Sequence, residues 1–181
     1  MRVFLAFAAL AAATPSLAAQ VDDRAAKAIA KPQELIVDKA LPATTVAAML
    51  KPVDAFYGFW NNGSATLLKA ALSPRFVDHT LPKGRPQGPA GPAAASKAFL
   101  GAVPDLRIDV VQRLVVGDRV VSHLHFTGHF TGTFMGTTGT GQPIDFIATD
   151  ILRVSGGMIT DNWHLEDNLT LQQQIGLVSA N

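Results

Sequence analysis

The 181-residue sequence contains no cysteine. Disulfide bonds, cysteine nucleophiles and thiol-linked lipids are therefore excluded, and an exported chain of this composition depends on its core alone. The sequence also has no Gly-x-Ser-x-Gly motif, which excludes the nucleophile elbow of many serine hydrolases. Its Gly-rich stretch GTFMGTTGTGQP begins at Gly132, between two expected strands rather than before a helix, so it lacks the arrangement that binds phosphate groups.

A strong excess of either charge is also missing, with 15 Lys and Arg against 14 Asp and Glu. Arg2 precedes an apolar run over 3–13, and small residues follow at 15–19, which is the pattern of a secretory signal peptide. The run is too short to span a bilayer as a mature helix. Removing residues 1–19 takes away one basic residue, Arg2, and leaves 14 positive against 14 negative residues.

These features predict where the protein is located and what it does not bind. We expect a periplasmic or secreted protein that does not insert into the membrane after signal cleavage. A net charge of zero argues against a basic groove, so we expect no nucleic-acid partner.

The rest of the sequence divides at about residue 43. Residues 20–43 mix charged residues with Ala and contain two prolines, which predicts a tether or loosely packed arm rather than a second domain. Residues 44–181 fit one domain, large enough to bury roughly two-thirds of its unfolded surface. We find no internal repeat in it.

Apolar residues in the first part of this domain recur with helical spacing. One helix is expected from Val46 to Trp60, and it ends at Asn61-Asn62-Gly63. Pro52 either kinks this helix or starts its second part. Ser64 can cap a second helix over 65–72. Further along, residues 75–80 predict a strand that enters a Pro- and Gly-rich loop, and a third helix is expected from Pro92 through Leu100.

After Pro104-Asp105 the apolar period changes to the alternation that is typical of strands. Strands are expected over 106–116, 119–134, 144–154 and 158–166, joined by short turns that make neighbouring strands antiparallel. Helices followed by a long antiparallel sheet predict an α+β domain with the helices packed on one face of a curved sheet.

Several short motifs follow one another in a specific order. They are D-H at 78–79, P-D-L at 104–106, G-D at 117–118, G-H-x-x-G-x-F-x-G from Gly128, D-x-x-R from Asp150, G-G-x-I from Gly156, and W-x-x-x-D from Trp163 before a Gln-rich helix. Over roughly residues 47–178 this order resembles the SnoaL-like polyketide cyclase (ester cyclase) branch of the nuclear transport factor 2-like (NTF2-like) superfamily.

The resemblance implies a cone-shaped α+β barrel in which helices close a deep apolar pocket on the concave side of the sheet, often in a homodimer. It also implies intramolecular aldol closure of a polyketide ester, without metal or organic cofactor, by a carboxylate near the last strand. That carboxylate corresponds to Asp167 in this sequence. The superfamily also contains isomerases, dehydratases, epoxide hydrolases and binding proteins, so the fold alone does not settle the reaction.

Strand alternation leaves two interpretations of Asp167 open. Trp163, Leu165 and Asp167 share one face, whereas His164 and Glu166 share the other. If the Trp163 face lines the pocket, Asp167 can act as acid and base there, because an apolar cavity raises the pKa of a carboxylate toward neutrality. Alternatively, Asp167 caps the terminal helix over 169–176. A register slip of one residue would exchange Asp167 for Glu166 on the inner face.

Other side chains are candidates for the same pocket. Asp150 shares its strand face with Phe146, so both are expected to line the pocket; the alternative for Asp150 is a carboxylate bonded across the sheet. His79 lies where a pocket rim is expected, or else bonds the loop backbone, and His164 is a further helper. Three aromatic residues either line the cavity or belong to the core: Tyr57, Trp60 and Trp163.

Three histidines, His123, His125 and His129, share one face of the strand over 119–134. At about 3.3 Å per residue His123 and His129 lie roughly 20 Å apart, so the three cannot share one metal ion. A two-histidine site completed by another strand is the alternative. We predict no metal and expect this face to be a polar dimer contact or a pocket wall, with His125 contacting the ligand.

Together these features favour an exported protein that binds a small apolar compound with a carbonyl group. It would act as a cofactor-independent cyclase, isomerase or lyase through Asp167, with Asp150, His79 and His164 as helpers. The alternative is a non-catalytic periplasmic ligand-binding or protein-interaction domain. Export favours this alternative, because polyketide assembly is intracellular.

Overall fold

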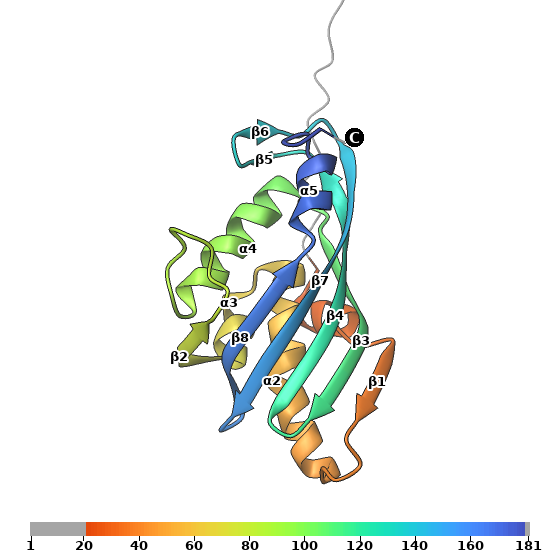
Figure 1. The fold of residues 1–181 in the computed structure, drawn as a ribbon, viewed down its shortest axis with the longest axis vertical. Coiled ribbons are helices and arrows are strands. Elements are labelled where there is room, and N and C mark those ends of the chain that lie inside the picture. Colours follow the sequence, from red (N-terminus) through yellow and green to blue (C-terminus); the bar gives the residue numbers. More distant parts are fainter. Residues whose placement is uncertain (1–20, 180–181) are drawn as a thin grey trace, which may run out of the picture.

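Six strands form one curved sheet in the order β1-β3-β4-β7-β8-β2 (Figure 1). The computed structural model describes residues 21–179, so the predicted signal peptide over 1–19 lies outside the described residues. The central strands pair antiparallel and are β3 (Arg107–Val116), β4 (Arg119–Phe130), β7 (Gln142–Ser155) and β8 (Met158–Glu166). The short strands β1 (Glu34–Val37) and β2 (Leu72–Asp78) pair parallel to β3 and β8. They form the two edges, so the described sheet is curved but open.

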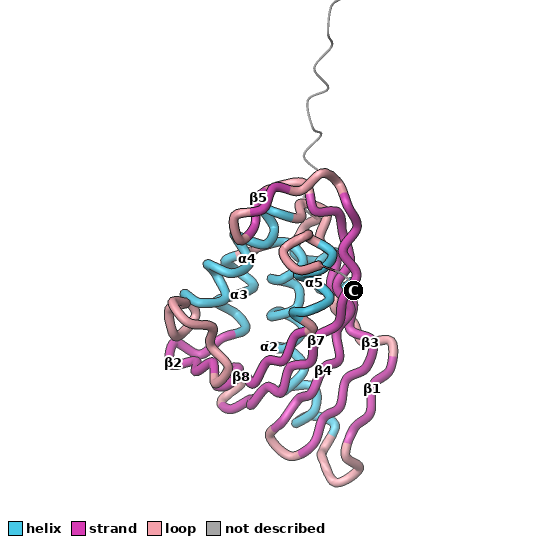
Figure 2. The backbone as a smooth tube through the Cα atoms, turned by 45° about the horizontal axis from the view of Figure 1, so that its top comes forward, coloured by secondary structure: helices cyan, strands magenta, loops and turns pink. Residues whose placement is uncertain are grey.

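The helices gather on one side of this sheet (Figure 2). The long helix α2 (Ala43–Asn62) lies along the concave face, and α3 (Ala65–Ala71) and α4 (Ala90–Ala102) extend the helical layer. The short helix α5 (Asn168–Gln174) follows β8 and packs against β7. Among the described residues, no helix is both long and apolar enough to cross a bilayer.

The core lies between α2 and the concave face because both present apolar side chains at the expected period. Val53, Phe56 and Tyr57 of α2 are at most 2% exposed. On β7 every second residue from Ile144 to Val154 is buried, and the residues between them are exposed or half-buried. The predicted α+β architecture, with helices on one face of a curved sheet, is confirmed.

The observed boundaries differ from the predicted ones mainly at two places. The helix that was predicted to begin at Val46 is α2, and it begins three residues earlier. It contains Pro52 in its interior and ends at Asn62 as predicted. The strand predicted over 119–134 ends at Phe130. The chain there turns to α4, because the amides of Thr131 and Gly132 both donate to the carbonyl of Ala102, at 3.0 and 2.9 Å.

Glycine makes this close approach feasible. A Cβ atom at Gly132 would lie 2.1 Å from the carbonyl oxygen of Gly101, a separation that side chains do not reach. The chain continues into a small hairpin of β5 (Thr133–Phe134) and β6 (Thr137–Thr138), which is separate from the main sheet. The Gly-rich stretch therefore allows the chain to turn away from the sheet at this point.

Residues 20–43 were expected to form a tether or a loosely packed arm, and the part that the structure describes, from Val21 onward, packs against the domain. Within them α1 (Asp23–Ile29) packs on α2, with Ala26 and Ala30 at 0% exposure, and β1 adds an edge strand to β3. Small side chains at these two positions let α1 approach closely. The Ala-rich composition that suggested a loose arm therefore belongs to a packed helix.

Candidate functional site

The register between β7 and β8 brings polar side chains together on the concave face. Asp150 pairs with His164, Leu152 with Asn162 and Ala148 with Glu166. Because Asp150 lies on the buried side of β7, its partners on β8 face the same way. The inner face of β8 therefore carries Asn162, His164 and Glu166.

Asp150 is the centre of this cluster and is 3% exposed. Its carboxylate accepts hydrogen bonds from the Tyr57 hydroxyl at 3.0 Å, from Nδ2 of Asn162 at 3.0 Å and from Nδ1 of His164 at 2.8 Å. A carboxylate has about four acceptor positions, so three are occupied. Asp150 is therefore suited to hold its neighbours in place and to balance charge.

Tyr57 reaches Asp150 from α2, on the other side of the core. Its side chain is 0% exposed. Burial and the nearby Asp150 carboxylate raise the pKa of the Tyr57 hydroxyl well above its usual value. Tyr57 therefore remains a neutral hydrogen-bond donor across the physiological pH range.

His164 lies between two carboxylates. Its Nδ1 bonds Asp150, and its Nε2 lies 3.3 Å from Oε2 of Glu166. Burial disfavours the charged ring, but Asp150 and Glu166 outweigh this effect and raise the pKa of His164 to about 10. The ring is thus an imidazolium at neutral pH, and both nitrogens donate.

One side of the cluster is accessible. The side chains of His164 and Glu166 are 30% and 25% exposed, against 4% for Asp150. Glu166 accepts one long hydrogen bond from His164, so its carboxylate retains open acceptor positions. His164 and Glu166 thus combine a proton donor with a carboxylate that can accept a proton, and general acid–base catalysis needs both groups.

A second buried charge, Arg113, lies behind Tyr57. Arg113 is 0% exposed, and its Nη1 binds Oδ1 of Asp54 at 2.7 Å. Its Nε and Nη2 donate to Oγ of Ser122 and to the carbonyl of Ala30, each at 3.2 Å. The guanidinium also lies 5.3 Å from the centre of the Tyr57 ring. Arg113 thus connects α1, α2 and the sheet.

Sequence reasoning placed Asp167 in the pocket if the Trp163 face were the inner one. The structure puts Trp163 on the opposite face of β8 from His164 and Glu166, so that condition is not met. Asp167 instead caps α5, with Oδ1 accepting from the amide of Thr170 at 3.1 Å and Oδ2 from its hydroxyl at 2.7 Å. These bonds hold the pKa of Asp167 below its usual value. The capping interpretation is the one observed.

His79 also lies on the outer face rather than at a pocket rim. Its ring stacks on Trp163, with ring centres 4.3 Å apart, and its Nε2 bonds Oδ1 of Asp161 at 2.8 Å. Arg119 and Arg153 approach the same Trp163 ring at 5.3 and 5.6 Å. His79 and Trp163, both predicted ligand contacts, therefore belong to an exposed stacking cluster.

The three histidines of β4 share one face of the strand, as predicted, and the structure shows that it is the outer face. Each has its own partner: His123 bonds Thr149 at 3.1 Å, His125 bonds Asp145 at 2.8 Å, and His129 bonds Asp105 at 2.7 Å. His125 is therefore not on the concave face with Asp150. Across residues 21–179, no group of three or more His, Cys, Asp or Glu side chains could hold a metal ion.

Two aromatic residues that were predicted to contact the ligand are Phe146, on the inner face of the sheet, and Trp60, on the helical side. Phe146 is 2% exposed and stacks on Phe126, with ring centres 4.8 Å apart. Trp60 is half-buried against Phe56 and Phe59. Phe146 shares the inner face with Asp150, as predicted, and it contributes to the apolar wall beside the cluster.

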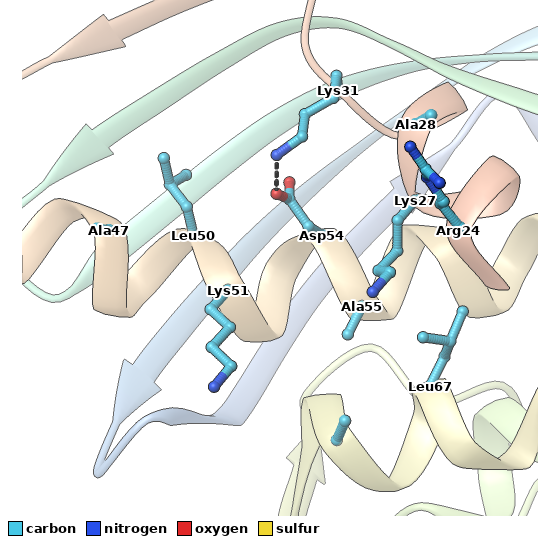
Figure 3. A pocket seen from close by; sticks show the side chains of 11 residues that line it. Arg24, Lys27, Ala28, Lys31, Ala47, Leu50, Lys51, Asp54, Ala55 and Leu67 are labelled. Carbon is cyan, nitrogen blue, oxygen red and sulfur yellow. Dashed lines mark hydrogen bonds and ion pairs between the residues drawn. The ribbon is translucent and has the colours of Figure 1, made fainter.

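A surface depression of about 650 Å3 lies elsewhere, between α1, α2 and α3 (Figure 3). It is lined mainly by small apolar and basic residues, and Asp54 and Lys31 are bonded to each other at its wall. The Asp150 cluster does not line it. The depression therefore differs from the concave-face pocket that the family resemblance implied.

Three residues of the cluster and its support were not predicted from the sequence: Asn162, Asp54 and Arg113. Glu166 was considered only as the residue that a one-residue register slip would place on the inner face. The β3 strand carries a register shift between Val110 and Gln112, which turns Arg113 inward instead of outward. Burial moves from the even position of Val110 to the odd position of Val115, a change that the structure shows and the sequence does not. Asn162 and Glu166 could have been found by adopting the alternative strand face.

The fold and this site define a class of protein: an α+β domain whose curved sheet presents buried acid and base groups to a layer of helices. Comparison with known sequences then gives the family. The SnoaL-like polyketide cyclase family matches residues 52–175. The chain belongs to this family, within the NTF2-like superfamily.

Solved structures agree with this assignment. A candidate polyketide cyclase from Bacillus cereus is 42% identical, with a TM-score of 0.75 over 83% of this chain and 95% of that chain. IdmH, a candidate polyketide cyclase from Streptomyces antibioticus, is 26% identical, with a TM-score of 0.62 over 69% and 96% of the two chains. A protein from Catenulispora acidiphila with a ketosteroid isomerase-like fold shares the fold at 17% identity, a TM-score of 0.55, and coverage of 69% and 92%. No curated protein matches the chain.

Proposed function

We propose that this protein catalyses proton transfer at a carbon next to a carbonyl group in a small apolar compound, without metal or organic cofactor. The observation that carries the proposal is the position of His164, whose ring is bonded to the buried Asp150 carboxylate and lies beside the accessible Glu166 carboxylate. Membership of the SnoaL-like polyketide cyclase family supports the same reaction class.

The residues have separate roles in this proposal. Glu166 removes a proton from the carbon, and the electron pair moves onto the carbonyl oxygen. Nε2 of His164 gives up its hydrogen bond to Glu166 and donates to that oxygen instead, which stabilises the developing negative charge. The enolate then attacks a second carbonyl and closes a ring, and the new alkoxide oxygen takes the proton from Glu166; alternatively, the enolate takes this proton back at another carbon. Asp150, Tyr57 and Asn162 keep His164 charged and oriented.

This proposal moves the reactive carboxylate from Asp167 to Glu166. Both carboxylate oxygens of Asp167 accept hydrogen bonds from Thr170 in the cap of α5. We expect it to affect the helix rather than the reaction.

The first prediction concerns exchange of hydrogen for deuterium at the activated carbon of β-keto esters and cyclic ketones, followed by NMR in heavy water. The proposal expects the protein to accelerate exchange and expects His164→Gln or Glu166→Gln to slow it about 100-fold or more, as is typical for loss of a positioned acid or base. Asp167→Asn is the matched control, since Asn also caps helices well, and should retain exchange within a few-fold.

Several outcomes would contradict the proposal. Equal loss in Asp167→Asn would return the reaction to Asp167, and full activity in Glu166→Gln would remove Glu166 as the base. If ketones raise the melting temperature but show no accelerated exchange, the alternative of a non-catalytic binding domain is favoured.

We also propose export to the periplasm or the medium, on the basis of the signal-like residues 1–19. Fractionation of expressing cells, with N-terminal sequencing of the recovered protein, tests it. Recovery of uncleaved protein in the cytoplasm would count against it.

A further inference from the structure

The depression between α1, α2 and α3 combines an apolar floor with a basic rim. Its volume of about 650 Å3 lies in the range of small-molecule sites. The floor consists of aliphatic side chains from all three helices: Ala28, Ala47, Leu50, Ala55, Leu67 and Ala70. Such a floor can receive the hydrocarbon part of a ligand.

Four cations also line the depression: Arg24, Lys27, Lys31 and Lys51. Asp54 is the one acidic residue among the described residues that line the depression, and it is bonded to both Lys31 and Arg113. No acidic side chain within residues 21–179 forms a salt bridge with the other three cations. The depression is thus locally positive in a chain whose charges are otherwise nearly balanced.

The basic rim is built into the helix packing. A Cβ atom at Gly58 would lie 2.9 Å from Cγ of Lys27 and 3.0 Å from Cδ1 of Leu67, so the bare backbone of α2 admits both side chains. Figure 3 shows Lys27 extending across α2 toward α3, and Lys51 pointing away from α2. The stem of Lys27 is therefore seated between helices, and its ammonium group is presented beside the floor.

We propose that this depression binds a small organic anion with an apolar body. The hydrocarbon part would cover the aliphatic floor, and the anionic group would form charge-assisted hydrogen bonds with Lys27 and Lys51. A neutral molecule of the same shape leaves both ammonium groups without a partner. Inorganic phosphate supplies charge but buries no apolar surface. The neutral molecule and inorganic phosphate should therefore both be poor ligands for this site.

Calorimetric titration of the full mature chain with octanoate, below its micelle concentration, tests the proposal. We expect saturable binding of octanoate, and much weaker binding of 1-octanol and of inorganic phosphate. The double variant Lys27→Met/Lys51→Met keeps the aliphatic stems and removes both charges, so its Kd for octanoate should rise at least tenfold. The matched control Lys97→Met removes an exposed charge on α4 and should leave the Kd within twofold.

Further controls separate this site from the concave face and from a membrane surface. His164→Gln should bind octanoate with an unchanged Kd, and a large loss there would place the ligand at the Asp150 cluster and overturn the proposal. Equal affinity for 1-octanol, or no effect of the double variant, would also overturn it. Co-sedimentation with phosphatidylglycerol vesicles without binding of free octanoate would identify an anionic membrane surface instead, and would equally reject the proposal.

Discussion

His164 occupies an inward strand position among polar side chains, and two carboxylates maintain its charge. The folded-state pKa of about 10 lies above the ordinary value of 6.5. Protonated His164 therefore stabilises the fold fully below about pH 6.5, and this contribution is lost as the pH rises through about 10.

The second prediction follows from this titration. The free energy of unfolding should fall between about pH 6.5 and 10, with a slope of at most about 1.4 kcal/mol per pH unit for one proton. His164→Gln should lack this part of the slope. Urea unfolding at several pH values measures both proteins, and identical slopes would show that His164 is not a buried imidazolium.

Arg113 and Asp54 form a pair in which one partner is completely buried and the other has 13% of its side chain exposed. Removing one member of such a pair leaves an uncompensated charge, whereas removing both does not. Asp54 retains Lys31 when Arg113 is lost, but Arg113 has no comparable second anion in the pairs that the structure describes.

The third prediction uses this asymmetry. Asp54→Ala should destabilise the protein by about 3–5 kcal/mol, the usual cost of breaking a buried ion pair. The double variant Asp54→Ala/Arg113→Met should be more stable than Asp54→Ala alone, because the buried charge is gone. Urea unfolding decides the matter, and additive losses in the double variant would argue against a coupled pair.

At the scale of elements, the end of β8 and the start of α5 decide what the polar sequence WHLED does. The strand sends His164 and Glu166 inward, and Asp167 then leaves the strand to satisfy the amide of Thr170. The same five residues thus serve three purposes: outer-face stacking by Trp163, an inner acid and base pair, and a helix cap.

The fourth prediction tests the cap. Asp167→Ala should lower the melting temperature because the first turn of α5 loses its side-chain acceptor, whereas Asp167→Asn should nearly preserve it. Differential scanning calorimetry gives both values. If Ala and Asn behave alike, the cap contributes little to the stability of α5.

At the scale of the whole molecule, the outer face of the sheet is notable for its apolar exposure. Ile147, Ile151 and Leu165 are 46%, 40% and 77% exposed. The register places them on neighbouring positions of β7 and β8, next to His123 and His125 of β4. We propose that a second copy of the chain covers this face, whose three histidines were expected to form either a polar dimer contact or a pocket wall.

The fifth prediction concerns this dimer. Light scattering should give the mass of two chains for the mature protein and of one chain for Leu165→Glu, because a charge at the centre of the contact opposes association. Leu169→Glu on α5 is the control, since Leu169 is also exposed but lies outside this face. A monomeric wild type, or a dimeric Leu165→Glu, would reject this interface.

The sequence by itself determined the order of the main helices and strands after residue 43, their apolar periods, and the placing of Asp150 and Phe146 on one strand face. These depend on local spacing, which the printed sequence carries. The face of β8 that turns inward depends on the register of the whole strand on β7. The sequence therefore left open whether Asp167 or Glu166 lies on the inner face. Arg113 points inward because of a bulge in β3. Helix α1 is packed because it lies against α2. Such features arise from contacts between distant segments, and only the tertiary structure decides them.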